Sequence, residues 1–92
     1  MNLPAEFSLI DGTFDLSDAK DLILGLLDHK IRFHSMKTFS STVRLGEKDD
    51  HSVTRLEMLK ASRAKFLEMV AAAENNNTQW SIQSAISIQT AE

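Results

Sequence analysis

The sequence predicts a small two-layer α+β domain in β-α-α-β order, with an antiparallel helix hairpin packed on a small antiparallel sheet. Three observations carry this prediction. A short segment near each end of the chain alternates apolar and polar residues, as a half-buried strand does. Between these segments, apolar residues recur at helical spacing over two long stretches. The chain has 92 residues, enough for one modest core, so we expect residues 1–92 to form a single domain.

The first expected strand covers Ala5–Ile10, where Phe7 and Leu9 alternate with polar residues. The dipeptide Asp11-Gly12 that follows is typical of a turn. Asp15 is a good N-cap, because its carboxylate can accept a hydrogen bond from a backbone N–H in the first helical turn. The first helix is therefore expected to begin at Asp15.

This first helix is expected to continue to about Lys37, and a second helix to run from Asp50 to about Glu74. Asp50 is again a capping aspartate, and three consecutive asparagines after Glu74 indicate the end of the helix. The segment between the helices, residues 38–49, lacks clear periodicity. We expect this segment to be the mobile link of the hairpin.

The last expected strand, Gln79–Thr90, has the clearest alternation in the chain. One face is expected to hold Trp80, Ile82, Ser84, Ile86 and Ile88. No charged residue occurs from Gln79 to Ala91, so no charge protects the edge of this strand from pairing with another chain. Because a two-stranded sheet alone is marginal in water, we expect a homodimer that joins two strand pairs into a four-stranded sheet. A strand from another protein partner would serve the same purpose.

The apolar stripe of the first helix spans about 200°, which is wider than one packing contact needs. We therefore expect this helix to contact both its neighbour helix and either the sheet or another subunit. The stripe consists of Leu16, Ala19, Leu22, Ile23, Leu24, Leu26, Leu27, Ile31 and Phe33.

Charge is unevenly distributed along the chain. The net charge is −3, yet residues 30–65 hold nine lysines and arginines against four acids. Such a basic block can face an anionic partner. Alternatively, a helix carries acids in its first turns and bases in its last turns, which matches the helix dipole.

Five basic residues in this block are the candidate contacts for an anion or a partner. They are Lys30, His34, Lys37, Arg44 and Arg63. Lys30 and Lys37 interrupt the apolar stripe of the first helix, and Arg63 interrupts a narrower apolar stripe on the second helix. This second stripe consists of Val53, Leu56, Leu59, Phe66, Leu67 and Val70. The alternative is that the lysine stems cover apolar surface, while Arg63 pairs with an acid such as Asp18 or Asp21.

The sequence predicts no catalytic, cofactor or metal site. There is no cysteine, and the three glycines are too far apart for a phosphate-binding loop. His29 and His34 are five residues apart, about 140° around a helix, so they cannot chelate one ion from a regular helix. His51 follows Asp49 and Asp50, where helix capping explains the cluster better than acid–base chemistry.

These observations favour a non-enzymatic protein–protein interaction or scaffold module that acts as a homo-oligomer. The alternative is a nucleic-acid or polyanion-binding module that uses Lys30, Arg32, His34, Lys37, Arg44 and Arg63. A third possibility is a small hydrolase or isomerase assembled across a dimer. No signal peptide or long apolar span is visible, so a cytoplasmic location without membrane contact is expected.

Overall fold

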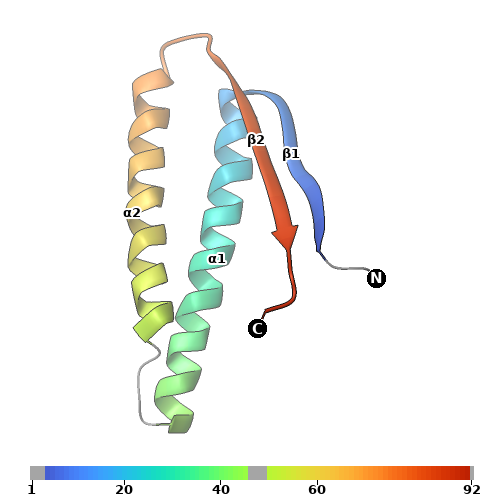
Figure 1. Cartoon of the computed structure of the whole chain (residues 1–92). Coiled ribbons are helices and arrows are strands. Elements are labelled where there is room, and N and C mark those ends of the chain that lie inside the picture. The colour runs from blue at the N-terminus through green and yellow to red at the C-terminus, as the bar shows by residue number, and fades with distance from the viewer. Residues whose placement is uncertain (1–3, 46–49, 92) are drawn as a thin grey trace.

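Two helices and two strands follow one another in the order β1-α1-α2-β2, which confirms the predicted α+β class (Figure 1). The computed structural model describes residues 4–45 and 50–91, and describes side chains only for 4–40 and 51–91. The elements are β1 (Ala5–Asp15), α1 (Leu16–Leu45), α2 (Asp50–Ala73) and β2 (Gln79–Ile88).

The two strands form an antiparallel ribbon that joins the two ends of the chain. Its register runs from Ala5 opposite Ile88 to Asp15 opposite Gln79. One face of the ribbon is apolar and the other is polar, since side chains alternate along each strand. The apolar face holds the cross-strand pairs Phe14/Trp80, Gly12/Ile82, Ile10/Ser84, Phe7/Ile86 and Ala5/Ile88. The predicted face of β2 is thus confirmed.

A β-bulge at Leu9 keeps this apolar face continuous. Ser8 pairs with Ala85 and Ile10 pairs with Ser84, so Leu9 is the extra residue on β1. Without the extra residue, the alternation of side chains along β1 would place Ser8, and not Phe7, on the same face as Ile10. The bulge therefore moves Phe7 to the same side as Ile10.

The predicted turn at Asp11-Gly12 is wrong, because β1 continues through both residues to Asp15. They pair with Gln83 and Ile82 of β2, so the ladder satisfies their backbone and no reversal occurs. Asp15 nevertheless caps α1 as predicted: the Asp18 backbone N–H donates to Asp15 Oδ1 at 2.8 Å. The strand thus leads directly into the helix.

α1 is eight residues longer than predicted, ending at Leu45 and not at about Lys37. Thr38–Leu45 contains serine and threonine, which are weak helix formers, but no glycine or proline to stop the helix before Gly46. The predicted mobile link over 38–49 is therefore wrong for residues 38–45. Residues 46–49 lie outside the part of the chain that the structure describes.

The asparagine run ends α2 within one residue of the predicted position. Helical hydrogen bonding stops at Ala73, and the Asn76 N–H donates to the Ala73 carbonyl at 3.0 Å in the turn that follows. β2 begins at Gln79 as predicted and ends at Ile88, two residues earlier than expected.

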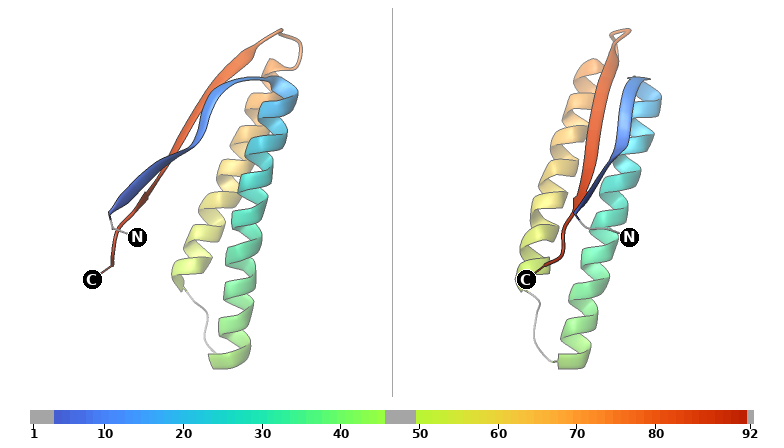
Figure 2. Two further views of the ribbon diagram at one scale, coloured as in Figure 1. Left: turned by 90° about the vertical axis from the view of Figure 1, so that its right-hand side faces the viewer. Right: turned by 45° about the vertical axis from the view of Figure 1, so that its right-hand side comes forward.

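The helices form an antiparallel hairpin, and the ribbon lies on one side of it (Figure 1). The ribbon contacts the hairpin where β1 meets α1 and diverges from it toward the chain ends, as the left view of Figure 2 shows. α1 contacts α2 and both strands, so the predicted double role of its wide apolar stripe is confirmed. We call the end where the ribbon meets the helices the junction and the opposite end the free end.

The molecule is flat and extended for its size. Its radius of gyration is 16.6 Å, against about 12 Å for a compact domain of this length. The backbone extends over 50 × 35 × 14 Å, so most side chains have protein on one side only. Among the described residues, the buried ones are Ile10, Ala19, His34, Ser52, Leu59, Val70 and Ala73.

Candidate interaction surface

An apolar pocket of about 390 Å³ lies at the junction, between the helix hairpin and the ribbon. The pocket is lined by Ile23 of α1, by Phe66 and Met69 of α2, and by Gln79, Trp80, Ser81 and Ile82 of β2. The rings of Phe66 and Trp80 meet edge to face, with their centroids 6.0 Å apart. This contact holds β2 against α2.

One stripe of α1 leaves the junction and becomes progressively exposed. Ala19, Leu26 and Phe33 are spaced seven residues apart, so they lie on one side of the helix. The exposed fraction of the residue rises from 0% at Ala19 to 38% at Leu26 and 52% at Phe33. The side of α1 that the ribbon covers at the junction is therefore open toward the free end.

The other two walls show the same gradient. On α2, Met58 lies eleven residues before Met69, which places it on the pocket-facing side of the helix but far from the pocket. Met58 is 54% exposed. On the apolar face of the ribbon, Phe14 and Trp80 are half-buried at the junction, while Phe7 and Ile88 are exposed at the free end.

These residues define one candidate surface, which we call the apolar wedge. Its helical wall consists of Leu26, Phe33 and Met58, and its ribbon wall of Phe7 and Ile88. Both walls begin at the junction, where Ile23, Met69 and Ile82 line one pocket and the rings of Phe66 and Trp80 meet. Exposed apolar stripes of this kind are typical of a binding site for a protein. The sequence predicted the wide stripe on α1 and a narrower stripe on α2, but neither includes Met58, and these stripes were not related to Phe7 of β1.

The predicted basic site is only partly assembled. The Arg63 side chain donates to Asp28 across the helix hairpin at 2.6 Å, so its acid partner is Asp28 and not Asp18 or Asp21. Lys30 lies over the Phe33 ring, with its Nζ 5.3 Å from the ring centroid. Its long side chain thus covers part of the helical wall, as the alternative interpretation predicted. Arg44 belongs to α1, but its side chain is outside the described part.

His34 lies between the two helices and faces Ser52. It is 8% exposed, and its Nδ1 is 3.4 Å from Ser52 Oγ, a long hydrogen bond whose donor depends on the tautomer. Burial lowers the pKa of His34 below 6.5, and the charges of Lys30, Arg55 and Lys37 and the nearby His51 lower it further. The structure therefore favours the neutral imidazole at the hairpin interface.

Arg55 and His51 join Lys30 and Lys37 around His34, whereas Arg63 does not. Neither Arg55 nor His51 was among the five predicted contacts. Aligning the two predicted helices antiparallel would have suggested both residues. Residues 51 and 55 lie one turn apart at the start of the helix that returns alongside residues 30–37. The basic group lies near the free end of the hairpin.

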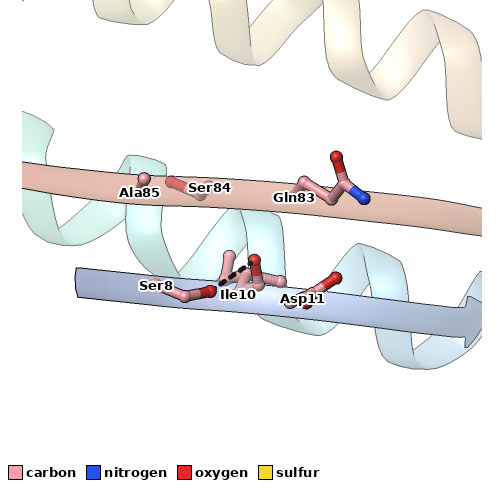
Figure 3. A pocket seen from close by; sticks show the side chains of 6 residues that line it. All are labelled: Ser8, Ile10, Asp11, Gln83, Ser84 and Ala85. Carbon is pink, nitrogen blue, oxygen red and sulfur yellow. Dashed lines mark hydrogen bonds between the residues drawn. The ribbon is translucent and has the colours of Figure 1, made fainter. Parts of the chain in front are cut away.

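A shallow polar depression of about 400 Å³ marks the bulge on the ribbon (Figure 3). Ser8, Asp11, Gln83 and Ala85 line it together with Ile10 and Ser84. The Ser8 hydroxyl donates to the Ile10 carbonyl at 3.4 Å, spanning the extra residue of the bulge. This bond explains the polar side chain at that position without a ligand.

Within residues 4–40 and 51–91, whose side chains the structure describes, no three histidine, aspartate or glutamate side chains come together as a metal ligand set would. None of the helices in that part of the chain has the length and apolar character needed to cross a bilayer. Comparison with known proteins places the chain in no group, as no family model, curated protein or solved structure matches it.

Proposed function

We propose that this protein is a non-enzymatic protein–protein interaction module that works as a homodimer. One observation carries the proposal. The chain exposes 7241 Å² of surface, whereas a compact monomer of 10.3 kDa exposes about 5,350 Å². The difference, about 1,900 Å² per chain, is surface that a folded domain of this size normally buries.

The exposed surface has the character of an interface. The exposed large apolar side chains of the apolar wedge are Phe7, Leu26, Phe33, Met58 and Ile88, and Met69 at the junction pocket is exposed as well. Aromatic residues and methionines are enriched in protein interfaces, because aromatic rings bury large apolar areas and methionine adapts its shape to the partner. The chain is also too thin for these residues to find cover within one copy.

Size-exclusion chromatography with light scattering tests the proposal, with absorbance recorded at protein and nucleic-acid wavelengths. We expect a protein-only peak with twice the chain mass of 10.3 kDa. A monomer that persists at 100 µM or about that concentration would contradict a homodimer, because interfaces of this size normally bind more tightly than that.

A second candidate function is the binding of nucleic acid or another polyanion. The grouping of Lys30, Lys37, Arg55 and His51 around His34 favours it, since clustered bases attract phosphates. The net charge of −3 argues against it. In this case the peak would carry nucleic acid that high salt removes, and the double variant Lys30→Glu/Lys37→Glu would not bind it.

A further inference from the structure

We infer that a second copy of this chain occupies the apolar wedge, so that the dimer interface consists of the facing helical and ribbon walls. The inference rests on the proposed homodimer and specifies its surface. It replaces the simplest alternative, in which two ribbons join only along the edges of β2 to form a four-stranded sheet.

Edge pairing alone leaves the helical wall uncovered. A strand added to the edge of β2 lies about 4.8 Å beside it in the plane of the ribbon. Leu26, Phe33 and Met58 belong to α1 and α2, which lie to one side of the ribbon and not beside it in its plane (Figure 2). Only an occupant that enters between the ribbon and the hairpin can cover both walls.

The surface area fits a second copy of the same chain. Two chains that each bury the excess of about 1,900 Å² would form an interface of about 3,800 Å², which is in the range of obligate homodimers. In a two-fold dimer each chain contributes the same patch, so one arrangement covers both wedges at once.

The first test compares two phenylalanines of α1. Phe33→Glu places a carboxylate in the helical wall, and Phe39→Glu makes the same change about 120° away on the helix, outside the wedge. We expect Phe33→Glu to raise the dimer Kd at least about 30-fold, as loss of an interface hot spot does. We expect Phe39→Glu to change it less than about threefold. Circular dichroism checks that both variants keep their helices.

The second test leaves the interface nearly intact and uses the absence of native cysteine. Met58→Cys puts a thiol in the helical wall, and Phe39→Cys puts one on α1 outside it. In the otherwise wild-type chain, we expect alkylation of the thiol at position 58 to slow about tenfold between protein concentrations that favour monomer and dimer. Alkylation at position 39 is expected to keep one rate.

The outcomes separate this inference from the proposed function. A wild-type monomer overturns both. A wild-type dimer that survives Phe33→Glu, with equal alkylation at positions 58 and 39 at every concentration, overturns the wedge and leaves the homodimer standing. A dimer that Phe33→Glu dissociates, with concentration-dependent protection at position 58 alone, supports the inference even if one substituted chain loses some helix.

Discussion

The junction and the free end of the wedge contain the same types of side chain, but only the junction covers them. At the junction, Ala19 and Val70 are buried and Trp80 packs on Phe66. At the free end, Phe33 and Phe7 are exposed, and the helices meet through the polar pair His34 and Ser52. The difference is one of distance: the same stripes continue while the ribbon moves away from the hairpin (Figure 2).

This contrast shows that the spacing of apolar residues determines which side of a helix is apolar. The spacing does not determine which part of the chain covers that side. The heptad spacing of Ala19, Leu26 and Phe33 is regular along α1. Their burial is set by the path of the ribbon, which depends on contacts distant in sequence. Stability should accordingly be concentrated at the junction in a single chain.

A substitution at the junction should have the largest effect, and it tests whether the stability of a single chain is localised there. Ala19→Asp buries a carboxylate at the most enclosed position of α1, and we expect it to lower the free energy of unfolding by at least about 3 kcal/mol. Urea denaturation measures the loss. The control Ser17→Asp makes the same charge change at an exposed residue in the same helix and should stay within about 0.5 kcal/mol of wild type. Equal losses would show that the junction is not the stable end.

A pH titration examines the free end. Because the pKa of His34 is lowered in the folded chain, the unfolded chain takes up the proton at higher pH. Stability is therefore complete above about pH 6.5 and falls as the pH drops from there toward the folded-state pKa. Thermal melts from pH 7.5 to pH 5.5 should show a falling Tm. The slope should flatten in His34→Gln and remain in His29→Gln, whose side chain is exposed.

Gly25 offers a smaller, stabilising change between the two ends. It lies inside α1, and an added Cβ would meet no heavy atom within 4 Å. We expect Gly25→Ala to raise the free energy of unfolding by about 0.5–1 kcal/mol, since alanine restricts the unfolded chain and favours the helix. A destabilised variant would mean that another chain covers this side of α1. Chemical denaturation at low and high protein concentration distinguishes the two cases.

The smallest effect is expected at the ion pair on the outer side of the hairpin. Arg63 and Asp28 are both partly exposed, so solvent screens their attraction. A double-mutant cycle with Arg63→Gln and Asp28→Asn should give a coupling free energy of about 0.5 kcal/mol or less. A coupling above about 2 kcal/mol would indicate that the pair is buried by a partner.

The element order and the capping of α1 could be predicted because they depend on local chemistry. Asp15 caps α1 and the asparagine run ends α2 whatever the rest of the chain does. The turn at Asp11-Gly12 was mispredicted, because pairing with β2 overrides a local preference for a turn. The extent of α1 beyond Lys37 was missed, since weak helix formers do not end a helix by themselves.

The candidate surface was harder to predict than the fold. The apolar stripe of α1 was visible in the sequence, but its relation to Met58 and Phe7 depends on how α2 and the ribbon return. The basic residues were grouped by their position along the chain. Folding separates Arg63, which pairs with Asp28, and brings Arg55 to His34 in its place.

The pairing of β1 with β2 also has a consequence for the order of folding. Its partners lie at opposite ends of the chain, so forming the ribbon first would close a loop of at least 63 residues, those between Asp15 and Gln79. Docking α1 on α2 shortens that loop, because it brings the start of α1 and the end of α2 to the same end of the hairpin (Figure 1). In the last folding step, we expect β1 and β2 to pair first at the junction and then progressively toward the ends of the chain. Amide hydrogens near Ala5 and Ile88 should exchange fastest with solvent, and each such opening exposes strand edges while the helices stay formed.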